Sequence, residues 1–283
     1  MSPDDLDPRA RAAIRRVLER PRFELIPLKN VLDQAAYLPD GATVSVTASP
    51  AKGMDATIEL SEELHARGFD VVPHLSARLT EDRSHLERIL KRIDNLGIDR
   101  VFVVGGDADP PGDFFDGLAL LSAMEDIGHA LREVGIPGYP EGHPVIPDGA
   151  LDRALIDKQP YATSVTTQMC FSSRAIVDWL GERRASGLTL PAVLGMPGVA
   201  DTLRLLKISA RIGVGHSIRF LRKNAAVAGR LALPGAYKPA ELLEGLGADL
   251  DDSTLDIRGV HIYTFNSCDS TEEWRRAYLE DLS

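Results

Sequence analysis

The chain has little cysteine, since its 283 residues include only Cys170 and Cys268. Two cysteines are too few for the disulfide framework of a small secreted protein, and a reducing compartment explains them more simply. No stretch approaches the roughly 18 consecutive apolar residues that a membrane span needs. The N-terminal segment is charged throughout and lacks the apolar centre of a signal peptide. These absences predict a cytoplasmic protein with no membrane association.

Basic residues are fewer than acidic ones. There are 32 Lys and Arg against 42 Asp and Glu, which gives a formal net charge of −10. An acidic chain is poorly suited to coat the phosphate backbone of a nucleic acid, so we expect no such partner. Hydrophobic residues at 44% and charged residues at 26% are ordinary for a globular protein and exclude a disordered, collagen-like or coiled-coil chain.

Short apolar or β-branched runs alternate along the chain with longer amphipathic stretches. The runs predict eight strands: Phe23–Leu28, Ala42–Ser49, Asp70–Ser76, Arg100–Gly106, Ile136–Glu141, Ala162–Cys170, Ala192–Met196 and Gly259–Asn266. The amphipathic stretches predict helices at Pro8–Leu18, Asp55–Arg67, Ser84–Leu96, Asp113–Val134, Ser172–Arg184, Asp201–Ala210, His216–Ala228 and Lys238–Leu246. Several of these helices are followed by a glycine, the usual C-terminal cap.

Eight strands alternating with helices favour one closed α/β barrel, a (β/α)8 TIM barrel over residues 1–283 with an extra N-terminal helix. Such barrels typically have about 250 residues. The alternative is an open doubly wound sheet, which would need a phosphate-binding glycine turn after its first strand. That strand is followed instead by Pro-Leu-Lys-Asn at 27–30, and Gly-Val-Gly at 213–215 is only a partial match to the glycine motif. We therefore expect the barrel.

Polar side chains gather near the ends of the predicted strands. The active sites of barrels lie at the carboxyl ends of the strands, so these side chains mark a candidate site. They are Glu24, Thr47, Ser49, His74, Ser76, Asp107, Asp109, Tyr139, Glu141, His143, Thr167, Gln168, Tyr263 and Asn266. Solvated charge alone would suffice for loops, so this concentration of Tyr, His and Gln indicates ligand binding.

Glu24 lies in an apolar strand, where a carboxyl group must be paired, coordinated or protonated. Burial would raise its pKa, as suits a general acid. Asp107 follows two glycines, which let the backbone approach a flat ligand, although a simple turn aspartate is the alternative. The amide of Gln168 offers a donor and an acceptor to the edge of a heteroaromatic ring. His74 is either a ligand-binding residue or a hydrogen-bonded core histidine.

Two classes of chemistry remain open on the residues alone. One is a metal-dependent hydrolase that uses His74, Asp107, His143 and His261, but the His-x-His pair usual on the first strand of such barrels is missing. The other is a cofactor enzyme that binds a flat heterocycle among Thr, Asp, Tyr and Gln side chains. A barrel can bind flavin phosphates in its loops without a Rossmann turn.

Seven ordered segments resemble motifs of the methylenetetrahydrofolate reductase family. They are Phe-Glu-Leu-Ile-Pro at 23–27, Val-Ser-Val-Thr-Ala-Ser at 44–49, Pro-His-Leu-Ser at 73–76, Gly-Gly-Asp at 105–107, Gly-Tyr-Pro-Glu-Gly-His-Pro at 138–144, Thr-Gln-Met-Cys-Phe at 167–171 and His-Ile-Tyr-Thr-Phe-Asn at 261–266. The segment at 138–144 is the most specific match. The resemblance runs from Phe23 to Asn266, which is most of the chain.

The resemblance implies a flavin-containing eight-stranded barrel of one-carbon metabolism. Members reduce 5,10-methylenetetrahydrofolate to 5-methyltetrahydrofolate, with NADH or NADPH as the donor that first reduces FAD. The family also leads us to expect a possible homo-oligomer. Sequence alone does not distinguish NADH from NADPH, because no acidic ribose-binding residue follows a Rossmann turn.

The resemblance also implies roles for particular residues. Glu24 would be the general acid that opens the five-membered ring of the folate, and Asp107 would stabilise the resulting cation beside the flavin. Gln168 would hold the folate, and Phe220 would stack on the nicotinamide or pterin. The residues implied to line FAD are Thr47, His74, Gly106, Asp107, Tyr139, His143, Asp152 and Lys158.

Two positions depart from the family pattern. Gly105 replaces the arginine of an Arg-Gly-Asp segment, and Ser267 replaces an arginine that often follows the last motif. Both changes remove a cation from the expected FAD site. The alternatives are therefore direct hydride transfer from the nicotinamide to the folate without FAD, or a relative that binds folate or flavin without catalysis.

Overall fold

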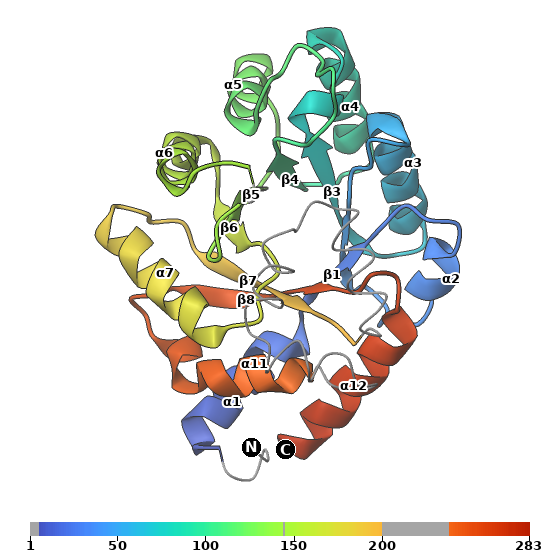
Figure 1. Ribbon diagram of the computed structural model, residues 1–283. Coiled ribbons are helices and arrows are strands. Elements are labelled where there is room, and N and C mark those ends of the chain that lie inside the picture. Colours follow the sequence, from blue (N-terminus) through green and yellow to red (C-terminus); the bar gives the residue numbers. More distant parts are fainter. Residues whose placement is uncertain (1–5, 144, 200–237) are drawn as a thin grey trace.

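The computed structural model describes residues 6–143, 145–199 and 238–283. Eight strands close into a barrel in which each strand runs parallel to both of its neighbours. They are β1 (Arg22–Leu25), β2 (Thr43–Val46), β3 (Asp70–Ser76), β4 (Arg100–Val104), β5 (Glu133–Gly138), β6 (Ser164–Thr167), β7 (Ala192–Pro197) and β8 (Ile257–Tyr263). The strands surround the centre of Figure 1 and the helices lie outside them. The expected TIM barrel is confirmed.

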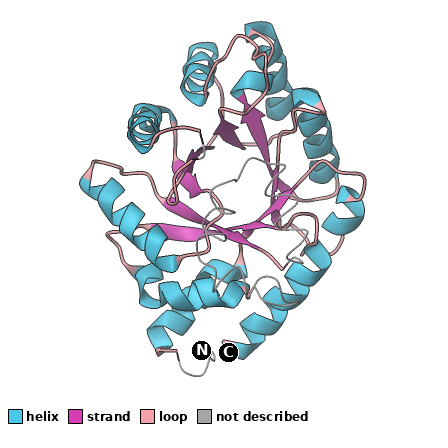
Figure 2. Ribbon diagram, viewed as in Figure 1, coloured by secondary structure: helices cyan, strands magenta, loops and turns pink. Residues whose placement is uncertain are grey.

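Helices form the outer ring in Figure 2. The described ones are α1 (Pro8–Glu19), α2 (Val31–Ala35), α3 (Gly53–Ala66), α4 (Arg83–Asn95), α5 (Gly117–Ile127), α6 (Asp148–Lys158), α7 (Ser173–Ala185), α11 (Pro239–Leu246) and α12 (Cys268–Asp281), with 3-10 turns η2 (Ala77–Leu79), η3 (Gln159–Tyr161) and η4 (Gly247–Asp251). Helix α1 is the expected N-terminal helix and packs against η4 and α12. In the described part of the chain, no helix has the length and apolarity to cross a membrane.

Local capping explains where several helices begin. The carboxylate of Asp82 accepts a hydrogen bond from the backbone N–H of His85 at 2.7 Å, and α4 begins directly after Asp82. The hydroxyl of Ser172 accepts one from the N–H of Ala175 at 3.2 Å and begins α7 in the same way. Each oxygen satisfies a backbone donor that has no partner within its helix.

One predicted helix, Asp113–Val134, is wrong in extent. Helix α5 ends at Ile127, before Gly128 with φ +83°, and the chain enters β5 at Glu133. Gly135, which follows the predicted helix in the position of a C-terminal cap, is therefore a strand residue. A Cβ on Gly135 would lie 2.8 Å from the ring of Phe102 on the neighbouring strand, so this position requires glycine.

Other differences concern short or polar elements. Helices α2, α6 and α12 were not predicted, and most strands are shorter than their apolar runs. The predicted helices Asp201–Ala210 and His216–Ala228 lie outside the described residues.

The two faces of the barrel strands have different chemistry, because successive strand residues point to opposite sides. The outward side chains, such as those of Phe23, Leu25 and Val44, are buried and apolar and belong to the core shared with the helices. Many inward positions carry polar groups instead. They include Arg22, Glu24, Ser45, His74, Arg100, Glu133, Ser164, Thr166 and His261. A barrel interior this polar needs partners for nearly every side chain.

Candidate active site

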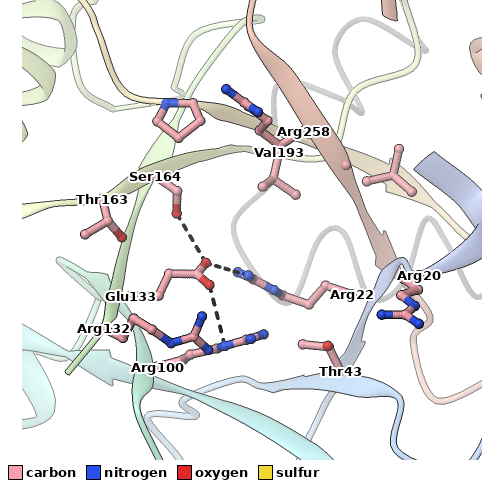
Figure 3. A pocket seen from close by; sticks show the side chains of 13 residues that line it. Arg20, Arg22, Thr43, Arg100, Arg132, Glu133, Thr163, Ser164, Val193 and Arg258 are labelled. Atoms are coloured by element: carbon pink, nitrogen blue, oxygen red, sulfur yellow. Dashed lines mark hydrogen bonds and ion pairs between the residues drawn. The ribbon is translucent and has the colours of Figure 1, made fainter. Parts of the chain in front are cut away.

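The polar interior has a lower layer at the amino ends of the strands, and Figure 3 shows that its side chains already pair with one another. Arg22 Nη2 lies 2.6 Å from Glu133 Oε1, and Arg100 Nε lies 3.7 Å from Glu133 Oε2. Although burial favours the neutral acid, the charges of Arg22 and Arg100 hold the pKa of Glu133 below its ordinary value. A cavity of about 380 Å³ opens beside these residues.

This end of a barrel ordinarily serves stability, whereas catalysis belongs to the carboxyl ends of the strands. The lower layer is therefore an ion-paired floor of the barrel and not the candidate site.

Above this floor, Glu24, Ser45, His74 and His261 form a second layer of buried polar groups. Glu24 Oε2 lies 3.1 Å from His261 Nε2, and the Ser45 hydroxyl lies 2.7 Å from His74 Nε2. The side chains of Glu24 and His261 are only 6% and 3% exposed. The ring of His74 also packs against Phe102, with ring centres 4.8 Å apart.

Burial determines the charge of this layer. It raises the pKa of Glu24 to about 7, although the proximity of His74 opposes that rise. Burial also lowers the pKa of His74 to about 4 and that of His261 to about 3, and the charge of Arg22 contributes to both. Both imidazoles are therefore neutral at neutral pH. Glu24 is the group in this layer that exchanges a proton near neutrality, which is the property expected of a general acid.

Four predicted residues follow the carboxyl ends of different strands and so lie around one mouth of the barrel. Thr47 directly follows β2, Tyr139 follows β5, Gln168 follows β6, and Asp107 lies in the loop after β4. The Gln168 side-chain oxygen accepts a hydrogen bond from the backbone N–H of Met169 at 2.8 Å. Its amide nitrogen donates to no described residue, so the nitrogen can bind a ligand.

Two further predicted residues are also near this mouth. His143 packs edge-on against the ring of Tyr139, with centres 5.3 Å apart, and burial raises the pKa of Tyr139 to about 12. Gly106 has φ +81°, and a Cβ at this position would lie 2.1 Å from the Ser76 hydroxyl. Gly106 is thus required by the close contact between the ends of β3 and β4, whether or not it also binds a ligand.

Asp152 is paired with a residue that the sequence analysis did not single out. Its carboxylate forms an ion pair with Arg183, which joins α6 to α7. Lys158, at the end of α6, has its Cδ atom close to the start of α5, 3.7 Å from where a Cβ of Gly117 would be. Burial lowers the pKa of Lys158 to about 8, against the opposing charge of Asp116. Phe220 lies outside the described residues.

The sequence did not identify Ser45 or the role of His261. His261 and Tyr263 are two residues apart on β8 and so share a strand face, and the centres of their rings lie 4.8 Å apart. Strand alternation alone would have placed Glu24 and His261 inward. Their pairing could not be read from the sequence, because it depends on β1 closing the barrel against β8.

The positions of the buried histidines do not support the alternative of a metal-dependent hydrolase. His74 and His261 bind Ser45 and Glu24 respectively, and in the described ranges no three His, Cys, Asp or Glu side chains converge as a metal site. The geometry defines a TIM barrel with a buried carboxyl group beneath its mouth.

Comparison with known proteins agrees with this description. The family model for methylenetetrahydrofolate reductase matches residues 27–275. A Caenorhabditis elegans protein named "Probable methylenetetrahydrofolate reductase (NADPH)" is 24% identical over 273 residues, which are 89% of this chain and 40% of that protein. The chain belongs to the methylenetetrahydrofolate reductase family and spans less than half the length of this relative.

A solved structure is also similar to the chain. It is a muconate cycloisomerase from Azorhizobium caulinodans, with 12% identity and a TM-score of 0.43 over 87% of this chain and 55% of that one. A likeness at this level carries no argument about function.

Proposed function

We propose that the chain catalyses the reduction of 5,10-methylenetetrahydrofolate to 5-methyltetrahydrofolate by NAD(P)H, or the reverse oxidation, in the cytoplasm. One observation carries the proposal: Glu24 is a buried carboxyl group with a pKa near 7 inside the barrel of a chain that belongs to this family. The reduction adds one proton and one hydride to the folate. The proton goes to N10 as its bond to the methylene carbon breaks, and the hydride from the nicotinamide goes to that carbon.

The residues of the chain supply the acid and the electrostatic part of this reaction. Protonated Glu24 gives its proton to N10, which opens the ring and leaves a 5-iminium cation. The carboxylate of Asp107, exposed beyond β4, stabilises this cation, whose charge develops only along the reaction. The amide nitrogen of Gln168, which donates to no described residue, donates to an acceptor on the pterin ring and so orients the folate.

The family resemblance also implies FAD, and the described residues match FAD only in part. When bound, FAD would carry the hydride between the nicotinamide and the folate. Thr47, Tyr139, His143 and Lys158 offer polar groups near the mouth, but Gly105 supplies no cation and the carboxylate of Asp152 pairs with Arg183. These residues do not make a complete site for the FAD pyrophosphate, and no step of the proposal passes through FAD.

That incomplete match favours a second candidate, direct hydride transfer from the nicotinamide to the folate. This reaction uses the same acid, cation-stabilising carboxylate and folate-binding amide. It differs in requiring the nicotinamide and the folate to bind at the same time, whereas a flavin allows them to bind in turn.

An anaerobic absorption spectrum of the purified protein tests these proposals. The spectrum is recorded alone, after FAD, after NAD(P)H and after methylenetetrahydrofolate. Flavin absorption that bleaches with NAD(P)H and recovers with the folate would support the FAD-dependent form. Folate-dependent oxidation of NAD(P)H without bound flavin would support direct transfer. No folate-dependent oxidation in either condition would contradict the proposed function. In whichever of these two conditions the wild-type protein turns over the folate, Glu24→Gln should lower that turnover by roughly 10²- to 10⁴-fold.

A further inference from the structure

The last motif of the chain contacts Glu24 and the backbone that follows it. His261 Nε2 lies 3.1 Å from the carboxyl oxygen Oε2 of Glu24, and the Thr264 hydroxyl donates to the Glu24 backbone carbonyl at 2.5 Å. The Asn266 amide forms two bonds with Ile26, accepting from its N–H at 2.9 Å and donating to its carbonyl at 2.8 Å. Strand β8 therefore contacts the side chain of Glu24, and the turn after β8 fixes the backbone of Glu24 and Ile26.

Backbone strain accompanies these contacts. Phe265 and Asn266 have φ values of +52° and +54°, in the left-handed region that non-glycine residues seldom adopt. Asn tolerates this region, but a bulky phenylalanine does not do so readily. Strained backbone persists where the surrounding structure requires it, and it is concentrated at functional sites. Here the two residues bring the Asn266 amide onto the backbone of Ile26, directly after β1.

The two nitrogens of His261 have different surroundings. Nε2 faces Glu24, whereas Nδ1 is buried and has no hydrogen-bond partner among the described residues. The groups that act on this ring are Arg22, Glu24, His74 and Tyr263. Burial together with the charge of Arg22 lowers the pKa of His261 to about 3 and keeps the ring neutral. A neutral imidazole has one N–H, so one nitrogen donates and the other can only accept.

The proton of His261 belongs on Nε2 for two reasons. A buried N–H without a partner is rarer than a buried acceptor without one, which disfavours the proton on Nδ1. A proton on Nε2 also lets the ring donate to Oε2 both when Glu24 is protonated and when it is a carboxylate. No exchange between the two ring forms is then needed during a catalytic cycle.

We infer that His261 is a positioning residue for the acid: its Nε2–H donates to Oε2 of Glu24 and so leaves the proton of Glu24 on the other oxygen, Oε1, for transfer to the folate. This inference rests on the proposed function. If Nε2 were the acceptor instead, the proton of Glu24 would lie in a hydrogen bond to His261 and would not be available to the substrate. The same N–H bond stabilises the carboxylate that remains after proton transfer, so it makes Glu24 a stronger acid.

Two variants separate this role from packing. His261→Gln keeps a neutral N–H donor near the position of Nε2, and His261→Leu removes it. The leucine variant should lower the kcat of folate reduction by about tenfold or more, with little change in the KM for NAD(P)H. Loss of the donor also moves the decline of activity at high pH upward by about one pH unit. The glutamine variant should restore most of the rate and the wild-type pH profile.

The matched control is His85→Gln, because His85 is equally buried but lies on α4 outside the barrel. It should leave the kinetics unchanged, and thermal unfolding checks that each variant folds. The inference is overturned if His261→Leu keeps the wild-type kcat and pH profile, or if the glutamine variant loses as much rate as the leucine variant. A wild-type chain without folate turnover, or a fully active Glu24→Gln variant, would instead contradict the proposed function.

A measurement without catalysis tests the same point in the unmodified protein. The ¹⁵N chemical shifts of labelled histidine report which ring nitrogen of His261 holds the proton. We expect the proton on Nε2 on both sides of the Glu24 titration, from about pH 6 to pH 8. A proton on Nδ1, or a doubly protonated ring, would overturn the inference even if the leucine variant did not fold.

Discussion

Arg22 and Glu133 form an ion pair with 2.6 Å between Nη2 and Oε1 across the floor of the barrel, where Arg100 and Ser164 also approach the same carboxylate (Figure 3). The Arg22 side chain is only 10% exposed, so its charge has little access to water. The floor thus resembles a buried ion pair more than a surface one.

Replacing Glu133 with Gln should therefore be costly. The change leaves Arg22 buried without a counter-charge, and we expect the free energy of unfolding in urea to fall by about 3 kcal/mol. Asp178→Asn is the control, since it removes a pair with Arg174 whose side chains are 59% and 89% exposed and should cost under about 1 kcal/mol. Equal effects of the two changes would contradict the structural role of the floor.

The buried histidines should make the protein sensitive to acid. The pKa values of His74 and His261 in the native state are lowered to about 4 and about 3. Below pH 6.5 these two histidines therefore bind protons in the unfolded chain but remain neutral in the native state. Their contribution to stability is present above pH 6.5 and is lost as the pH falls. Glu24 acts in the opposite direction between pH 7 and 4.5, because its raised pKa lets the native state hold a proton that the unfolded chain lacks. The three groups together leave a net difference of about one proton.

His74→Gln should remove this net difference. The dependence of unfolding free energy on pH between 6 and 5 should become less steep by about 1.4 kcal/mol per pH unit. Urea unfolding at several pH values measures the slope. His129→Gln, at an exposed position, is the control and should leave the slope unchanged. An unchanged slope in the His74 variant would mean that His74 titrates alike in both states.

Gly106 should tolerate substitution less well than its neighbour Gly105. An alanine at Gly106 meets both a positive φ and the Ser76 hydroxyl, and we expect a loss of about 2 kcal/mol. At Gly105 the nearest atom to an added Cβ is 3.9 Å away, so Gly105→Ala should have little effect on stability. Adding Ser76→Ala to the Gly106 variant should recover part of the loss, because it removes the contact and leaves only the backbone strain. No recovery would show that the contact with Ser76 is unimportant.

Much of the fold could be predicted because its signals are local. Strand and helix alternation, with capping residues such as Ser172, depends on a few neighbouring positions and identified all eight strands. The boundary at Gly135 failed because the reason for that glycine is the ring of Phe102, more than thirty residues earlier in the sequence. A boundary that depends on a tertiary contact is harder to predict from the sequence than one that depends on neighbouring residues.

The sequence predicted Glu24 and several residues around the mouth of the barrel, but it did not predict which side chains pair. Glu24 could be identified because a carboxyl group in an apolar strand must be paired, coordinated or protonated. His261, its partner, is 237 residues away, and only closure of the barrel brings the two together. The resemblance placed Asp152 at the FAD, but the position of Arg183 opposite it on α7 was not visible in the sequence.

A substitution of Asp152 can therefore distinguish a structural role, in the ion pair with Arg183, from a role in binding FAD. Its carboxylate pairs with Arg183, whose side chain is only 13% exposed, so Asp152→Asn should lower the free energy of unfolding by about 1 kcal/mol. If the pair with Arg183 is the function of Asp152, the variant should titrate with FAD like the wild-type protein and should reduce folate at the same rate.

Lys158→Met provides the comparison for Asp152→Asn. Lys158 lies on the same helix, and its side chain packs beside Gly117, the first residue of α5. If FAD binds at the mouth, loss of this cation should weaken FAD binding about tenfold, whereas Asp152→Asn should not. A loss of FAD affinity in the Asp152 variant without a change in unfolding free energy would reverse the assignment. It would mean that the pair with Arg183 opens when FAD binds, and that Asp152 has the role that the family resemblance gives it.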